Sequence, residues 1–171
     1  MTTYLEYRER PFLPDDVANV VDRLANDLTE DAPRAARAAD FFAGSGSFGF
    51  VLNRHMELDV NDLMENMPPV ASRVSIGGPV QSGELYYLHT LGPHVSGSKE
   101  VVDGVFMGGD YDQLRSILRT DPKLAKHVRF FVGYSGWELG QLEKELEQRS
   151  WLITHADKRR IMNTKIEDLW A

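Results

Sequence analysis

The stretch VRFFVGYSGWELGQLEKEL, residues 128–146, passes from a short apolar run into a segment with helical spacing. The run VRFFV is rich in β-branched and aromatic residues and is followed by glycine, a pattern typical of a buried strand. The next segment predicts a helix over 137–148, because an apolar stripe follows, interrupted by Gly140. The stretch therefore predicts a strand joined directly to a helix. Ser135 lies at the junction of this strand and helix, where it could be a nucleophile or the residue that begins the helix.

Two interpretations compete for Ser135. A hydrolase nucleophile elbow reads G-x-S-x-G, but here Trp137 stands where the second glycine belongs. Ser135 and Glu138 instead form S-x-x-E, the capping box, in which the serine oxygen accepts from an early helix N–H and the glutamate accepts from the N–H of the serine. The spacing therefore favours Ser135 as a helix N-cap over Ser135 as a nucleophile. A helix start preceded by glycines also offers N–H groups to an anion, although Glu138 would compete with it.

Outward from this stretch, short apolar runs bounded by Gly, Pro, Asn or Asp predict about six strands. They are SFGFVLN (47–53), VSIGG (74–78), LYYLHT (85–90), GVFMGG (104–109), VRFFVGY (128–134) and SWLITH (150–155). Helical spacing adds segments 17–28, 60–67, 111–119 and 165–171, with Asp59 and Asp110 as N-caps and a Thr164/Glu167 capping box. The pattern predicts an α+β fold, a single domain with one main mixed sheet and flanking helices. Residues 1–45 are an atypical, partly helical, Ala- and Arg-rich segment, and residues 46–171 are the core.

Composition limits the classes of function. The 171 residues are 42% hydrophobic and 26% charged and contain no cysteine, which fits a soluble cytoplasmic protein and excludes a thiol nucleophile. We expect no signal peptide and no membrane span, because no apolar run nears 18 residues. The net charge of −7 disfavours direct DNA binding. The adjacent cations Lys158, Arg159 and Arg160, with Lys165 nearby, are more typical of a solvated helix face.

Candidate ligand- or partner-binding residues lie at strand ends and glycine turns. Asn53 and Arg54 end an apolar run, and an arginine there can bind a carboxylate of a ligand or of its own fold. Three glycine turns at strand ends would expose backbone amides to one cleft if the strands are neighbours. We expect no metal site, because the histidines lack metal-ligand spacing, and no cofactor. The candidates are Asn53, Arg54, Gly77, Gly78, His89, Gly108, Gly109, Tyr134, Ser135, Gly136, Trp137 and Gln141.

Read together, these motifs resemble the AlgH/YqgE family of bacterial proteins. The resemblance runs through GSFGFVLNR (46–54), IGGPVQSGELYYLH (76–89), GVFMGGD (104–110), RFFVGYSGWELGQLEKEL (129–146) and WLITHAD (151–157). It implies a compact α+β fold with a twisted, partly barrel-like sheet in a cytosolic protein, and no established reaction. Some members carry the label of transcriptional regulator, but this sequence contains no recognisable DNA-binding motif.

The chain departs from the family pattern at both ends. Residues between Pro11 and Gly46 look helical where the family has strand-like sequence, and the chain stops at Ala171, soon after the LW pair. An absent edge strand would leave an unpaired ladder, which predicts a homodimer.

Three functions follow as hypotheses. The first is a non-enzymatic regulatory protein that binds a small anionic ligand or a protein partner in a cleft near the glycine turns, Arg54, Trp137 and Gln141. The second is a hydrolase or transferase that acts on an anionic substrate, with His89 as base and Arg54 as clamp, which requires both side chains to face one space. The third is a transcription-linked regulator that binds nucleic acid, which requires the basic residues 158–160 and Lys165 to join a broader positive patch.

Overall fold

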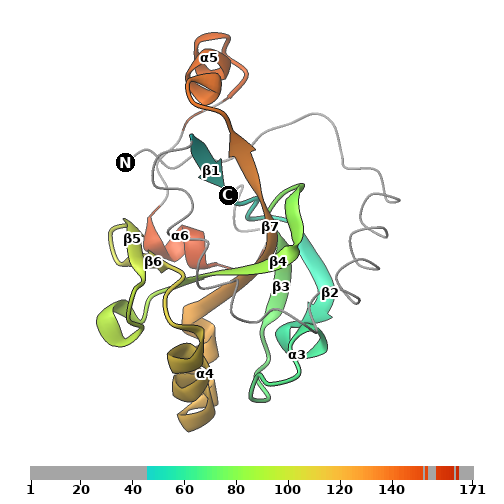
Figure 1. Ribbon diagram of the computed structural model, residues 1–171, viewed down its shortest axis with the longest axis vertical. Coiled ribbons are helices and arrows are strands. Elements are labelled where there is room, and N and C mark those ends of the chain that lie inside the picture. The colour runs from blue at the N-terminus through green and yellow to red at the C-terminus, as the bar shows by residue number, and fades with distance from the viewer. Residues whose placement is uncertain (1–45, 152, 154–156, 164, 166–171) are drawn as a thin grey trace.

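The fold is described by a computed structural model, which places residues 46–151, 153, 157–163 and 165 (Figure 1). Its centre is a seven-stranded mixed sheet in the order β2-β3-β7-β4-β6-β5, with β1 paired to β7 off this path. The strands are β1 (Ser47–Gly49), β2 (His55–Asp59), β3 (Arg73–Ile76), β4 (Val80–His89), β5 (Lys99–Val102), β6 (Val105–Met107) and β7 (Val128–Trp137). The β3–β7 pair is parallel, and the other pairs are antiparallel.

The predicted α+β class and mixed sheet are confirmed, whereas the barrel-like character is not. In the described part of the chain the strand order ends at β2 on one side and at β5 on the other, so the sheet is open. The twist is visible where β4 and β7 curve past each other in Figure 1. The two long strands carry the sheet, because β7 pairs with β1, β3 and β4.

Short helices surround the sheet. They are α3 (Val60–Leu63), α4 (Tyr111–Thr120), α5 (Gln141–Glu147) and α6 (Lys158–Met162), with 3-10 turns η2 (Gly92–His94) and η3 (Pro122–His127). Asp110 caps α4 as predicted, since its carboxylate accepts from Gln113 N at 3.0 Å. Asp59 is the N-cap of α3, where its backbone N–H donates to Asp62.

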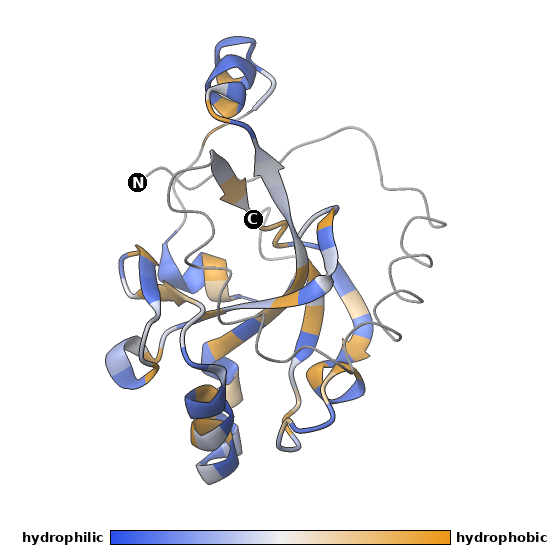
Figure 2. Ribbon diagram, in the orientation of Figure 1, coloured by the Kyte–Doolittle hydropathy of each residue, from blue (hydrophilic) through white to orange (hydrophobic). Residues whose placement is uncertain are grey.

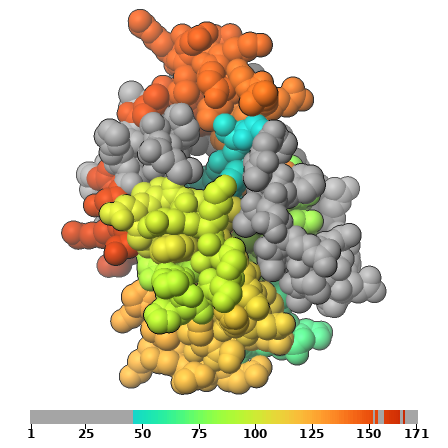
Figure 3. Space-filling model, turned by 60° about the vertical axis from the view of Figure 1, so that its left-hand side comes forward, coloured from blue at the N-terminus to red at the C-terminus, as the bar shows by residue number. Residues whose placement is uncertain are grey.

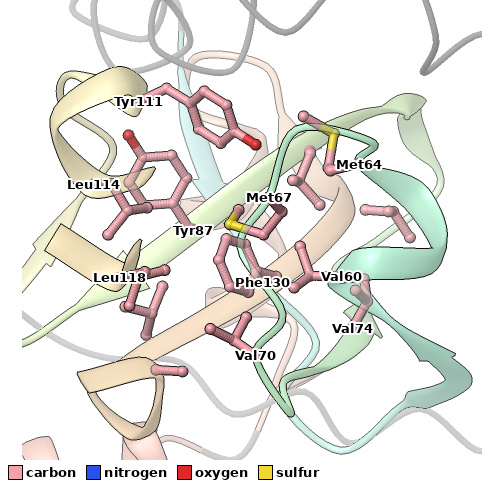
Figure 4. Close-up of a cluster of buried hydrophobic side chains, with 14 of the residues drawn as sticks. Val60, Met64, Met67, Val70, Val74, Tyr87, Tyr111, Leu114, Leu118 and Phe130 are labelled. Carbon is pink, nitrogen blue, oxygen red and sulfur yellow. The ribbon is translucent and has the colours of Figure 1, made fainter. Parts of the chain in front are cut away.

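Alternation along β7 divides the apolar residues between the two faces of the sheet. Phe130 and Val132 join a large cluster with α4 and the segment after α3 (Figure 4). Phe131 joins a second cluster that includes Leu52 and Ile161. Figure 2 shows hydrophobic residues in the first half of β7, whereas much of α4 is hydrophilic. Because β7 is covered on both faces, Arg129 on this strand is buried as well.

Several predicted elements differ from the structure. The sequence missed β2 and β5, and it predicted a strand over 150–155, where the described residues Trp151 and Ile153 are not in a strand. The helix expected over 137–148 covers only 141–147, because β7 continues to Trp137. The helices expected over 17–28 and 165–171, and the Thr164/Glu167 box, fall outside the described residues, apart from Lys165.

Candidate functional site

Ser135 lies inside β7 and does not begin a helix, so the capping-box interpretation is wrong. It pairs with Gly49 of β1, and Trp137 pairs with Ser47. The Ser135 hydroxyl donates to Gly77 O at 3.4 Å. Strand pairing with β1 therefore keeps the segment extended, and this tertiary contact overrides the local capping signal. The helix begins only after Gly140, whose φ of 78° reverses the chain.

Two of the three glycine turns, Gly77–Gly78 and the one at Gly133, meet at one backbone crossing. A Cβ on Gly77 would lie 2.3 Å from Gly133 O, and a Cβ on Gly78 would lie 2.2 Å from the carbonyl carbon of Tyr134. Gly133 itself has a φ of 65°, in the region that favours glycine. The glycines are therefore explained by the close passage of the β3–β4 connection over β7. At this crossing β7 passes from its pairing with β4, which reaches Tyr134, to its pairing with β1, which begins at Ser135.

The third glycine turn lies at the other end of β4, so the expected common rim of three glycine turns is wrong. Gly108 N donates to Tyr87 O at 3.1 Å, and Gly109 O accepts from the Tyr87 hydroxyl at 2.6 Å. Strand β4 runs from Val80, beside Tyr134, to His89. Ten extended residues span about 30 Å, which separates this turn from the crossing.

The pairing of His89 with Arg54, which the enzyme hypothesis requires, does not form. His89 is fully buried, with Nε2 3.0 Å from Gly108 O and Nδ1 accepting from Leu91 N. Burial lowers the pKa of His89, although the hydrogen bond to Gly108 O acts in the opposite direction. The neutral ring can make both contacts, donating from Nε2 to Gly108 O and accepting at Nδ1 from Leu91 N. Arg54 precedes β2, which is three places from β4, the strand of His89, in the sheet order. Its carbonyl accepts from Ile76 N, and the β7 residues that pair with Ile76 and His89 are four residues apart.

A carboxylate that sequence reasoning missed organises the end of β7 and α5. Glu145 Oε2 accepts from the indole N–H of Trp137 at 3.1 Å and from that of Trp151 at 2.8 Å. Gln141 Nε2 donates to the other oxygen at 3.0 Å. The two indole rings meet edge to face with centroids 5.6 Å apart. Two predicted candidates, Trp137 and Gln141, thus belong to one cluster, together with Glu145 and Trp151, which we call the indole–carboxylate cluster.

The cluster holds the short loop of Glu138, Leu139 and Gly140. Glu138 N donates to the Gln141 side chain at 3.0 Å, and Gln141 N donates to Glu138 O at 2.9 Å. Leu139, between them, is 87% exposed. Figures 1 and 3 show α5, in orange, projecting at the end of the molecule opposite α4. We call residues 137–147 with Trp151 the head. Its loop is fixed internally, yet it presents a large apolar side chain to solvent.

A second polar cluster, also missed, surrounds Arg129 on the opposite face of the sheet from Phe130. Nη1 donates to Ile161 O at 2.6 Å and to Asn163 O at 3.2 Å, and Nη2 donates to Leu52 O at 2.6 Å. Burial lowers the pKa of Arg129 to about 10, which leaves it charged at neutral pH. One signal was present in the sequence, since Arg129 is the only charged residue within the run VRFFV. The guanidinium joins the segment before β2, strand β7 and the end of α6.

A serine and a histidine also lie beside Arg129. Ser75 Oγ is 2.9 Å from His55 Nδ1 and 3.5 Å from Arg129 Nη2. This is the distance expected of a nucleophile and its base. Ser75 is only 1% exposed, however, so its hydroxyl does not reach solvent in this conformation. The contact is therefore part of a buried hydrogen-bond network.

The remaining expectations concern metals, membranes and the basic cluster. Among the residues that the structure describes, no group of three His, Asp or Glu side chains is placed to hold a metal ion. No described helix is long and apolar enough to cross a membrane. Lys158 of α6 packs near the β5–β6 turn, its Cδ 3.2 Å from where a Gly104 Cβ would lie. That turn also carries Asp103, and Glu100 of β5 accepts from Gly104 N, so Lys158 adjoins acidic residues there.

Comparison with known proteins gives consistent matches over most of the chain. Residues 42–171 match the family model DUF179, AlgH-like. A UPF0301 protein of Chlorobium limicola is 40% identical over 126 residues, 74% of this chain and 67% of the relative. A UPF0301 protein of Bacteroides thetaiotaomicron is 34% identical over 131 residues, 73% of this chain and 64% of the relative.

Two solved structures are similar. The solution structure of the AlgH protein from Pseudomonas aeruginosa has a TM-score of 0.59 and 28% sequence identity, covering 80% of this chain and 79% of that protein. Protein DIP2367 from Corynebacterium diphtheriae has a TM-score of 0.51 at 19% identity, covering 69% and 63%, which is a likeness of fold alone.

Proposed function

Because the chain belongs to the AlgH-like family, whose relatives above are named without a reaction, we propose that it is a non-enzymatic, cytosolic regulatory protein that binds a protein partner through the head. The observation that carries this proposal is Leu139, which is 87% exposed on a loop that the indole–carboxylate cluster holds in place. A binding role is favoured over hydrolysis because His89 is fully buried and does not meet Arg54, the pairing that the enzyme hypothesis required.

A fixed loop favours binding for an energetic reason. Ordering a loop and its side chains on association costs free energy, and a loop that is already ordered avoids that cost. Here the order comes from hydrogen bonds of Glu138 and Gln141 and from Gly140, whose left-handed conformation ends the loop. An exposed leucine on such a loop can enter an apolar pocket of a partner with little loss of conformational freedom.

The charges around Leu139 indicate the chemistry of the partner. Glu138, Glu143 and Glu147 are exposed on the head, against the single exposed lysine Lys144 and, just beyond, Arg149. A partner with an apolar pocket and a basic rim would match this pattern, because complementary charges favour encounter and orientation. The same acidic surroundings disfavour a small anion at this end of the molecule. The head therefore supports the protein-partner form of the binding hypothesis.

Site-specific photo-crosslinking in the native host tests the proposal. A photoreactive amino acid at Leu139 should give one discrete adduct with a second protein. The same probe at Asp112, exposed on α4 at the opposite end, should not give it. With the purified partner, Leu139→Ala should weaken binding about 10-fold, as truncation of an anchoring side chain does, and Asp112→Ala should leave it unchanged. Equal adducts from both positions, or equal affinities, would contradict the proposal.

A second variant separates contact from loop order. Glu145→Ala keeps the leucine side chain at position 139 but removes the hydrogen-bond acceptor that Trp137, Trp151 and Gln141 share. Binding should fall, and amide exchange in the loop should rise, while the amides of α4 stay protected. If Glu145→Ala raised loop exchange without changing affinity, preorganisation would not contribute to binding.

A further inference from the structure

We propose that Arg129 is the centre of a binding site for a small oxyanion of the carboxylate or phosphate class, enclosed by the segment before β2, strand β3 and the end of α6. This site is distinct from the head and does not depend on the function proposed for it. Four observations carry the inference: an uncompensated charge, an unpartnered donor, a neighbouring hydroxyl and a neighbouring basic helix.

The charge of Arg129 has no counter-ion among the described residues. Its side chain is 2% exposed, and all of its hydrogen-bond partners are neutral: three backbone carbonyls and the Ser75 hydroxyl. Its Cζ also lies 5.1 Å from the centre of the Phe131 ring. Buried cations in proteins are normally paired with an anion, because removing a charge from water is costly. A bound anion would supply the missing compensation.

One donor of the guanidinium is unused. Arg129 Nε is buried and has no hydrogen-bond partner in the described structure, whereas Nη1 and Nη2 each donate to carbonyls. Buried N–H groups are almost always bonded, so an orphan of this kind marks a place where a partner belongs. An oxyanion is the acceptor that a guanidinium binds best, through short charge-assisted bonds. The ligand therefore has an oxygen directed at Nε.

A second donor lies next to the guanidinium. The Ser75 hydroxyl is 3.5 Å from Nη2, and His55 Nδ1 is 2.9 Å away on its other side. A hydroxyl turns to suit its surroundings, so it can donate to an anion and keep the histidine contact as an acceptor. Arginine and serine together give a site with two donors from two adjacent strands, β7 and β3. The buried setting limits the ligand to a small anion.

The helix beside this site is basic, although the chain as a whole is acidic. Two half-buried residues adjoin it, since the His55 ring contacts Ser75 and Asn163 O accepts from Arg129. Helix α6, whose last residues Arg129 contacts, carries Arg159 and Arg160, whereas its Lys158 lies at the β5–β6 turn. Neighbouring cations raise the local concentration of anions even where the net charge is negative. This gives a role to the basic residues that the sequence singled out and that direct DNA binding did not explain.

Side-chain NMR of arginine tests the site. In ¹⁵N-labelled protein, the Nε–Hε signal of Arg129 is assigned by its loss in Arg129→Lys. Sodium formate and inorganic phosphate are then titrated against sodium chloride at constant ionic strength. We expect this signal to shift saturably with formate, phosphate or both, while that of Arg115, half-buried and paired with Asp112, stays fixed. Formate alone identifies a carboxylate site, and phosphate alone identifies a phosphate site.

Two further results would overturn the inference. One is an Arg129 signal that moves no more with formate or phosphate than with chloride. The other is a Ser75→Ala variant that binds the anion as tightly as the wild type, since removal of that donor should weaken binding about 10-fold. Should Arg129→Lys fail to fold, the Nε–Hε signal is assigned through the side-chain carbons of Arg129, and Ser75→Ala still tests the site. Backbone amide signals of α4 at their wild-type positions show that the Ser75→Ala protein is folded.

Discussion

Replacing Gly78 by alanine should destabilise the protein strongly, because its hydrogen atoms face the backbone of the central strand. The new Cβ would lie 2.2 Å and 2.3 Å from the carbonyl carbon and oxygen of Tyr134, and 2.4 Å from Ser135 N. Ordinary contacts begin near 3.4 Å, so the β3–β4 connection and β7 would have to separate by about 1 Å. Gly78 does not have a positive φ, so the whole cost comes from this overlap.

The expected magnitude follows from overpacking of a closed interior. Inserted methyl groups typically cost about 1–3 kcal/mol, and a backbone in mid-sheet yields less than a side chain does. We therefore expect a loss of about 3 kcal/mol in the free energy of unfolding. For a chain of this size, that loss lowers Tm by about 6–12 °C.

Urea unfolding followed by tryptophan fluorescence measures the loss, with two glycines as controls. Gly49→Ala meets only the Trp137 ring at 3.5 Å, an ordinary contact, and should stay within about 0.5 kcal/mol of wild type. Gly140→Ala meets no atom within 4 Å but has a φ of 78°, and it should cost about 1 kcal/mol from backbone strain alone. If Gly78→Ala were as stable as Gly49→Ala, the close crossing would be refuted.

Three other predictions concern tyrosines and a helix cap. Tyr87→Phe loses a buried hydrogen bond of 2.6 Å and should cost about 1 kcal/mol, whereas Tyr111→Phe removes an unpartnered hydroxyl (Figure 4) and should be neutral or stabilising in the same urea assay. Burial raises the pKa of Tyr111 to about 12, above its unfolded value near 10. Ionisation of Tyr111 therefore does not affect the free energy of unfolding below about pH 10 and lowers it as the pH rises toward 12. The urea midpoint of the wild type should therefore fall over this range, and less so in Tyr111→Phe; an equal fall in both would exclude Tyr111 as a cause. Asp110→Ala should cost about 1 kcal/mol through loss of the α4 cap, against about 0.5 kcal/mol or less for Asp112→Ala, which breaks only a surface ion pair.

The parts of the fold that the sequence predicted are those that local physics determines. Buried strands such as β4 and β7 show long apolar runs, and the cap at Asp110 follows from its own neighbours. The strands that were missed, HMELD (β2) and KEVV (β5), end the sheet and carry charged residues. Edge strands are often charged, because charges oppose unwanted pairing, and this removes the apolar signal.

The site was predicted less well because its contacts are distant in the chain. The glycines were recognised, but which of them meet depends on strand pairing, which separates Gly108 from Gly78 and brings Gly133 to it. Ser135 carries a complete local capping signal, yet pairing with β1 extends it. The acceptor of the indole groups, Glu145, has no signal in the sequence, since a glutamate on a short helix is most often solvated.

The stretch 133–146 can now be divided by what each residue does inside the protein. Gly133 is required by the crossing, and Trp137, Gln141 and Glu145 are joined in the indole–carboxylate cluster. Leu142 is buried, which accounts for the apolar face of α5. No such contact accounts for the side chain of Leu139, whose exposure the surrounding hydrogen bonds preserve. A leucine that packs against no other part of the protein, on a loop held by hydrogen bonds, is best explained by a contact outside the chain. The crosslinking experiment therefore begins at Leu139.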